Sequence, residues 1–331
     1  MKRLAKIATI LALGVAASAL ANDGIAEREA GGLVFKHNDD IDMLSEDLFV
    51  SADEIRVRYR FRNQSARDVR VTVGFPLPDN DLRDEFYGDV AYPTDFRTSV
   101  DGRPIEMAVE YRAYWNGVDQ SDLLTRLGVP LANPDNLDPD PIVAALSGLS
   151  QADRDRLLAI GLVEPFGDPR PGRLLSPIWT IREIRHREQV FPAGREIIVE
   201  HRYRPGAGGT HSSAISHPEF RASESGREMI ARYCIDSDFV TTLERFRQGQ
   251  GGEYIGEQTV SYILTTGAGW RSPIGDFRLV IYKGRPENIV SFCGEGVRKI
   301  SPTQFEIRRR NWRPSQDLHV LIIQPRFVPD S

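Results

Sequence analysis

Four arginines in one short segment are the side chains best suited to bind an anionic ligand. They are Arg56, Arg58, Arg60 and Arg62, and they alternate with apolar residues. Alternation with period two is typical of a strand with one buried and one exposed face. A row of guanidinium groups favours phosphate and carboxylate, because each group donates two parallel hydrogen bonds. We therefore expect charge reversal at Arg58 and Arg60 to weaken binding to anionic envelope material such as phosphorylated lipopolysaccharide. The alternative is a solvated face whose arginines pair with acidic residues on neighbouring strands.

His186 and His201 form a candidate metal site. If Ala193 and Gly194 are the two-residue loop of a hairpin, the two histidines lie directly opposite each other. Their Cβ atoms would then be about 4.5–5.5 Å apart. Two imidazoles would begin a zinc or copper site, but such sites need three or four ligands, and the sequence places no third one. The alternative is a pair of partly buried histidines that are hydrogen-bonded within an interface.

Trp270 is a candidate for a recognition surface. It follows Gly267 and Gly269, whose tight turn would force the indole outward, and it precedes Pro273. Aromatic rings bind sugar rings and anchor protein partners. The alternative is that Trp270 packs at the edge of a core. Replacing it with alanine separates the two interpretations, because loss of folding indicates a core position.

Hydrolytic activity is the alternative class of function. His211 and His217 lie near several serines in a segment that reads as a loop. Serine, histidine and an acid can form a triad in any chain order, but no G-x-S-x-G motif supports one here. The sequence therefore favours a non-catalytic binding or scaffolding protein with no cofactor. A metal-dependent or serine-type hydrolase of envelope polymers is the alternative.

The first 21 residues have the pattern of a signal peptide. Lys2, Arg3 and Lys6 precede an apolar stretch that ends in an A-x-A cleavage site at 19–21. The mature chain is expected to begin at Asn22, in the periplasm or outside the cell. No later apolar run approaches the roughly 20 residues of a membrane helix. An envelope protein or polysaccharide is the expected partner.

Charge and cysteine content agree with this expectation. The formal net charge is −5, and removal of the three basic residues of the signal leaves −8. An acidic chain argues against nucleic acid as a partner. Cys234 and Cys293 are the two cysteines, and in an oxidising compartment an even count predicts one disulfide. The alternative is two separately buried thiols.

The pattern of strands and turns predicts a mainly β fold with two antiparallel β-sandwich-like regions and helical insertions. The expected regions are 22–112, a helical insertion and linker at 113–173, and 174–331 with a helical segment near 225–247. Residues 55–78 read as a β-hairpin, as do the runs on either side of Asp101–Gly102. Ser150 is expected to cap a helix that Gly161 ends.

Several motifs resemble a secreted bacterial family known as domain of unknown function 4424. They are the signal peptide and the segments Phe75–Pro78, Gln189–Pro192, His201–Pro205, Tyr233–Asp236 and Thr266–Ile274. The resemblance covers nearly the whole mature chain. It implies an envelope location and a β architecture, and it brings no activity or cofactor. A shorter likeness, from Asn63 to Arg103, is to the vault/inter-alpha-trypsin β-sandwich domains, which are interaction modules.

Overall fold

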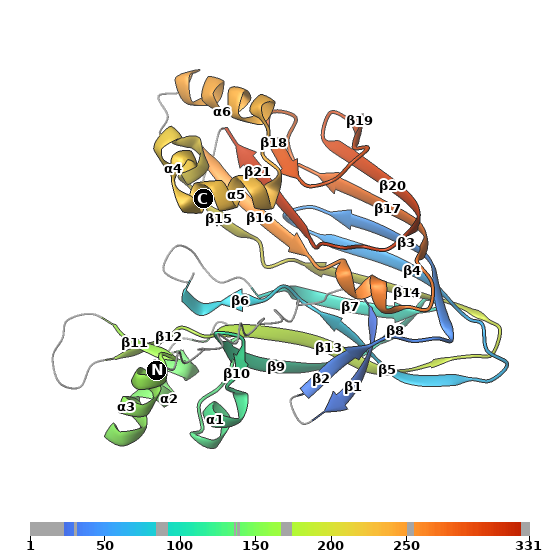
Figure 1. Cartoon of the computed structure of the whole chain (residues 1–331), viewed down its shortest axis with the longest axis horizontal. Coiled ribbons are helices and arrows are strands. Elements are labelled where there is room, and N and C mark those ends of the chain that lie inside the picture. Colours follow the sequence, from blue (N-terminus) through green and yellow to red (C-terminus); the bar gives the residue numbers. More distant parts are fainter. Residues whose placement is uncertain are drawn as a thin grey trace, which may run out of the picture.

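The structure is a computed structural model that describes residues 23–29, 32–83, 92–135, 137, 140–166, 174–249 and 255–325. The expected signal peptide lies outside the described residues. Strands dominate the described part, so the prediction of a mainly β protein is confirmed (Figure 1). No described helix is long and apolar enough to cross a membrane.

An eight-stranded sheet, the central sheet, runs through the molecule in the order β19-β20-β17-β3-β4-β14-β7-β8. Its strands are β3 (Ile41–Val50), β4 (Ile55–Asn63), β7 (Thr94–Val100), β8 (Arg103–Ile105), β14 (Glu196–Arg204), β17 (Ile274–Tyr282), β19 (Arg298–Ser301) and β20 (Gln304–Trp312). Neighbouring strands are antiparallel except β3 and β17, which are parallel. This one parallel pair joins the N-terminal strands to the C-terminal strands.

Two further sheets pack against the central sheet. The seven-stranded sheet contains β1 (Gly24–Glu29), β2 (Gly32–Lys36), β5 (Val69–Pro76), β6 (Asn80–Asp81), β9 (Ala108–Trp115), β10 (Val118–Asp119) and β13 (Thr180–Phe191). The four-stranded sheet contains β15 (Gly208–Thr210), β16 (Gly256–Tyr262), β18 (Ile289–Phe292) and β21 (Leu318–Gln324). A separate pair consists of β11 (Val163–Pro165) and β12 (Leu175–Pro177).

Both smaller sheets cover the same face of the central sheet. Leu48, Val57 and Leu279 lie side by side on β3, β4 and β17, and all three are buried. The largest hydrophobic core contains these residues together with Phe75 of the seven-stranded sheet and Val320 of the four-stranded sheet. The two predicted sandwiches therefore share one sheet. The other face of that sheet carries the alternating polar side chains.

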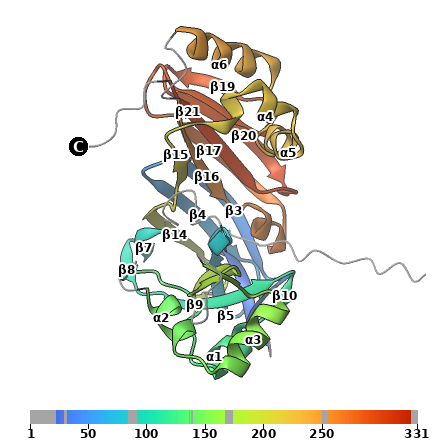
Figure 2. The same cartoon turned by 90° about the vertical axis from the view of Figure 1, so that its left-hand side faces the viewer.

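Helices close the two ends of the molecule (Figures 1 and 2). The insertion forms α1 (Ser121–Arg126), α2 (Pro141–Ser147) and α3 (Gln151–Ile160), whose apolar residues pack with Trp179 and Ile181. The second helical segment forms α4 (Pro218–Ala222), α5 (Glu224–Tyr233) and α6 (Ser237–Gly249). As predicted, Ser150 caps α3 and Gly161 ends it with a φ of 82°. Leu321 and Ile323 pack with α5 and α6, so β21 is apolar on both faces.

The prediction of a hairpin at 55–78 is wrong, although both strands exist. β4 belongs to the central sheet and β5 to the seven-stranded sheet, so the turn between them crosses the core. β13 and β14 are divided between the same two sheets. The two crossing turns are joined by hydrogen bonds from Asn63 Nδ2 to Phe191 O (2.8 Å) and from Ala193 N to Asp68 Oδ1 (2.9 Å).

The location of β13 and β14 also changes the expected organisation. Both strands fall in the expected C-terminal region, 174–331, but they pair with strands that precede residue 116. The sheets therefore do not divide at residue 174. The hairpin at Asp101–Gly102 joins β7 to β8, and both turn residues have a positive φ.

Candidate ligand-binding groove

A groove of about 790 Å³ lies along the central sheet and is rich in arginine. Its cationic lining residues are Arg56, Arg58, Arg97, Arg185, Arg202 and Arg278, and its acidic ones are Asp47, Glu106 and Glu200. The arginines come from β4, β7, β13, β14 and β17, so five strands position them. Six guanidinium groups and three carboxylates line the groove. Three more carboxylates outside this lining also pair with its arginines: Glu54 with Arg56 and Arg202, Glu183 with Arg185, and Glu306 with Arg278.

Most of these arginines are partly neutralised by acidic neighbours. Arg58 lies 3.2 Å from Glu200, and Arg278 lies 3.1 Å from Asp47. These pairs are solvent-exposed, and such pairs typically stabilise by no more than about 1 kcal/mol. An incoming anion could therefore compete for Arg58. Arg185 and Arg278 are in addition held 2.8 and 2.9 Å from the buried carboxylates of Glu183 and Glu306. Arg97 is exposed and forms no ion pair with any residue that the structure describes.

The arginine row of β4 divides at the edge of this groove. Arg56 and Arg58 line the groove, whereas Arg60 and Arg62 do not. Arg60 and Arg62 instead lie 2.7 and 3.9 Å from Glu196 on β14. The alternative of acidic cross-strand partners thus describes three of the four arginines, because Glu200 on β14 pairs with Arg58 as well.

Apolar side chains supply the rest of the lining. Phe49, Phe96 and Met107 are half-buried there. The guanidinium of Arg185 lies over the ring of Phe96, 4.5 Å from its centroid, and Arg56 lies over Phe49 at the same distance. Stacking of this kind orients a guanidinium group, and the edges of these two arginines face Glu183 and Glu54. The groove thus combines directed cations with apolar surface.

A buried hydrogen-bonded network, here called the Asp23 network, lies behind the groove. Asp23 has no exposed surface, and its Oδ1 accepts a hydrogen bond from His201 Nε2 at 3.1 Å. The carboxylate only accepts, so His201 Nδ1 is left to accept from the Thr98 hydroxyl at 2.9 Å. Arg187 Nη2 lies 3.4 Å from the other oxygen of Asp23. Thr98 and His201 line the groove, so the network connects the groove to the N-terminal segment.

The Asp23 network combines an ionised acid with a neutral imidazole. Burial opposes ionisation of Asp23, but His201 and Arg187 outweigh it and lower the pKa of the carboxyl below 3.8. Burial lowers the pKa of His201 below 6.5, although Asp23 opposes that shift. The folded protein therefore resists protonation at both groups.

This resistance predicts a loss of stability in acid. The unfolded chain binds a proton at His201 near pH 6.5, whereas the folded chain binds it only at a lower pH. The free energy of unfolding should fall below pH 6.5 by up to about 1.4 kcal/mol per pH unit for this group. Asp23 adds a second fall below pH 3.8. Urea unfolding at several pH values measures both slopes.

The control for this prediction is His201→Gln, which keeps polar atoms at the site but does not titrate between pH 4 and 7. His319 also has a pKa lowered by burial, so it contributes to the same pH range. The slope between pH 6.5 and 4.5 should therefore be smaller in the variant, without vanishing. Equal slopes in the two proteins would show that His201 is not responsible.

The expected pairing of His186 with His201 is wrong. The tight turn forms at Pro192–Arg195, but the strands beside it enter different sheets. His186 lies opposite Gly74 and Ala108, while His201 lies opposite Val57 and Thr98. Within the described residues, no group of three or more His, Cys, Asp or Glu side chains is placed to hold a metal.

The expected exposure of Trp270 is also wrong. Trp270 directly follows the short 3₁₀ helix η3 (Thr265–Gly269), and the residue is 1% exposed. Its ring packs against Phe61 with centroids 4.6 Å apart, and Nε1 donates to the Asp23 carbonyl at 2.7 Å. An aromatic residue beside a large core is stabilised by burial of its ring, and here its polar N–H also finds an acceptor. Trp270 is therefore a core residue.

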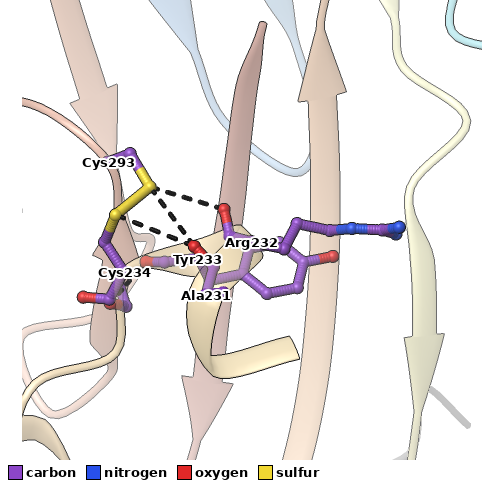
Figure 3. The surroundings of a disulfide bond; sticks show 6 residues. Ala231, Arg232, Tyr233, Cys234 and Cys293 are labelled. Atoms are coloured by element: carbon purple, nitrogen blue, oxygen red, sulfur yellow. Dashed lines mark hydrogen bonds between the residues drawn. A yellow bond between two sulfur atoms is a disulfide. The ribbon is translucent and has the colours of Figure 1, made fainter. Parts of the chain in front are cut away.

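The predicted disulfide between Cys234 and Cys293 is confirmed (Figure 3). Cys234 follows α5 in the left-handed conformation with a φ of 52°, and Cys293 follows β18. Ser291 Oγ donates to the carbonyl of Tyr233 at 2.9 Å, so a hydrogen bond reinforces the covalent link. The bond fixes the edge of the four-stranded sheet to α5.

Fold and groove together define a protein of β-sandwich type with an arginine-rich, partly apolar groove. The chain belongs to the family described as a domain of unknown function (DUF4424), whose model matches residues 21–321. The family resemblance expected from the motifs is thus confirmed. No curated protein is significantly similar to the chain in sequence.

Among solved structures, the chain is distantly similar to a protein from Legionella pneumophila. That protein is provisionally described as a nutrient-binding protein. The TM-score is 0.43 and the sequence identity 14%, over 92% of this chain and 72% of that chain. At this level the likeness does not extend to a ligand.

Proposed function

We propose that this protein is a non-catalytic binding or scaffolding protein of the bacterial envelope that holds an anionic ligand in the arginine-lined groove. The observation that carries the proposal is the convergence of six arginines from five strands on one groove of about 790 Å³. That volume lies within the usual range for small-molecule sites. Phosphate or carboxylate groups on an envelope polysaccharide or protein have the chemistry that these arginines recognise.

A periplasmic or secreted location belongs to the same proposal. Its support is the signal-peptide pattern at 1–21 and the disulfide, since such bonds persist in oxidising compartments. An acidic net charge with a locally cationic groove also fits a ligand that is recognised at one site. It does not fit a long nucleic acid, which needs a broad basic surface.

Charge reversal at Arg58 tests the groove. Arg58→Glu should weaken binding of tripolyphosphate by about ten- to a hundredfold, because a charged hydrogen bond contributes roughly 1.5–3 kcal/mol and is replaced by repulsion. Isothermal titration at low and physiological salt measures the change. Lipopolysaccharide and its dephosphorylated form extend the test to envelope material.

Arg62→Glu is the matched control. Arg62 is on the same strand as Arg58 and projects from the same face of the sheet, but it lies outside the groove. Its reversal changes the net charge of the protein by the same amount. Binding that weakens equally in both variants would indicate attraction to the whole surface and would argue against the groove.

The hydrolase alternative has one observation in its favour. Thr98, His201 and Asp23 place a hydroxyl, an imidazole and a carboxylate in one hydrogen-bonded row. Thr98 is only 6% exposed, however, and its hydroxyl lies 3.0 Å from the sulfur of Met107. We therefore favour binding over hydrolysis. Release of product from bound ligand by the wild type, and its absence in Thr98→Ala, would establish the hydrolase instead.

A further inference from the structure

A second groove, of about 730 Å³, opens between the central sheet and the four-stranded sheet. It is called the edge groove here, because it lies beside β18, the edge strand of the smaller sheet, and beside β20. Its apolar lining residues are Leu264, Phe277, Leu279, Val290, Phe292, Val297, Phe305, Ile307, Trp312 and Leu318. The edge groove is separate from the arginine-lined groove and shares no lining residue with it.

The aromatic residues of the edge groove are not all buried in its walls. Phe277 is 2% exposed and forms part of the core, whereas Phe292, Phe305 and Trp312 are half-buried. Phe277 and Trp312 are in contact, with ring centroids 4.5 Å apart. Partly exposed rings in a concave cavity that is also lined by polar side chains suit a ligand with both an apolar and a polar part.

The position of the edge groove between two sheets favours a narrow ligand. Its two walls are the facing surfaces of packed sheets, which lie about 10 Å apart. Side chains such as Ile307 and Val290 project from these walls and occupy part of the space. The gap that remains suits one extended chain better than a bulky ring system.

The mouth of the edge groove is held by the disulfide. Cys293 begins the segment that leads from β18 to β19, and the bond to Cys234 ties it to the end of α5 (Figure 3). Gly294 follows, and a side chain at this position would meet Ile307. The tether and the glycine together bring this segment close to the groove.

The charged residues at the mouth differ in their freedom to meet a ligand. Asp236 accepts a hydrogen bond from Phe239 N, and Asp317 accepts from the backbone of Leu264, so the fold already uses both. Glu295 is almost entirely exposed, and its carboxylate makes a weak ion pair with Arg309 at 3.8 Å. Arg309 Nη2 also donates to the Glu295 carbonyl at 2.6 Å, which leaves its other N–H groups to meet a ligand. Arg309 is the cation that lines this groove.

We propose that the edge groove binds an amphiphile with a single acyl chain, with the chain between the two sheets and an anionic head at Arg309. This activity is independent of anion binding in the arginine-lined groove. Binding in the edge groove requires burial of the acyl chain of the ligand, which contributes about 0.8 kcal/mol for each methylene group.

Laurate and dodecanol, titrated separately into the full chain, test the proposal by Trp fluorescence and calorimetry. Val297→Asp should weaken laurate binding at least tenfold, because Val297 lines the mouth and a carboxylate there repels the head and disfavours the chain. Ile300→Asp is the matched control and should bind normally. Val297 and Ile300 are 38% and 43% exposed, so neither change should unfold the protein, and Ile300 is outside the groove.

Two further variants locate the head and the site. Arg309→Gln should weaken laurate binding and leave dodecanol binding unchanged. Arg58→Glu should leave both unchanged, which separates this site from the arginine-lined groove. Failure of the folded wild type to bind laurate, or equal effects of Val297→Asp and Ile300→Asp, would overturn the proposal. The proposal would also be overturned if Arg58→Glu lost laurate binding while Val297→Asp and Arg309→Gln kept it.

Discussion

Replacing Asp23 with alanine should lower the free energy of unfolding by about 3–5 kcal/mol, because removal of one partner leaves buried charge uncompensated. Asp23 has no exposed surface and faces His201 and Arg187, which are themselves 1% and 7% exposed. Arg187 Nη1 already lacks a hydrogen-bond partner among the described residues. Without the carboxylate, a guanidinium group would be buried with no counter-charge.

Urea unfolding at pH 7 measures this loss. Asp23→Asn keeps the size of the side chain and can still accept one hydrogen bond, so it should be less damaging than Asp23→Ala. Asp39→Ala is the surface control, because the side chain of Asp39 is 93% exposed. A change of less than about 0.5 kcal/mol in Asp23→Ala, typical of surface sites, would contradict the importance of the network.

The secondary structure of this protein follows closely from local patterns. The alternation at 55–63 and 69–76 forms strands that bury the expected side chains, because period two places alternate residues on one face. The same pattern cannot tell whether consecutive strands pair or face each other across a core. Both arrangements bury the same residues, and only the pairing with β13 and β14 decides between them.

The arginine-lined groove was only partly predictable. Arg56 and Arg58 belong to a visible row, but Arg97, Arg185 and Arg278 come from strands far apart in the sequence. Their convergence depends on strand order in the central sheet, which no local pattern encodes. Arg185 is the least predictable, because it reaches Phe96 from the opposite sheet.

The Asp23 network was not predicted either, and its residues show why. Asp23 lies next to the expected mature N-terminus, where an acidic residue normally remains in solvent. Sequence spacing alone predicts a hairpin in which His201 lies opposite His186. The crossing turn places His201 in the core instead, where the N-terminal segment supplies its partner. Trp270 contacts the same segment, because its Nε1 donates to the carbonyl of Asp23.

Trp270→Ala should destabilise the protein by about 3–5 kcal/mol, as is usual when a large aromatic residue is removed from a core. The substitution opens a cavity beside Phe61 and Phe191 and removes the hydrogen bond to the Asp23 carbonyl. Trp270→Phe should lower the free energy of unfolding by less than Trp270→Ala does. Phenylalanine keeps a ring in the cavity, so the variant loses mainly the hydrogen bond, which contributes about 1 kcal/mol. Urea unfolding of the three proteins gives the ranking.

Trp312→Ala is the control of the same residue type, since Trp312 is half-buried at the edge groove. It removes an equal volume from a site that solvent can refill, so its effect on stability should be smaller than that of Trp270→Ala. A stable Trp270→Ala variant that loses a binding partner would restore the surface interpretation of Trp270. The burial of the indole, and its hydrogen bond to the N-terminal segment, argue that stability will be lost instead.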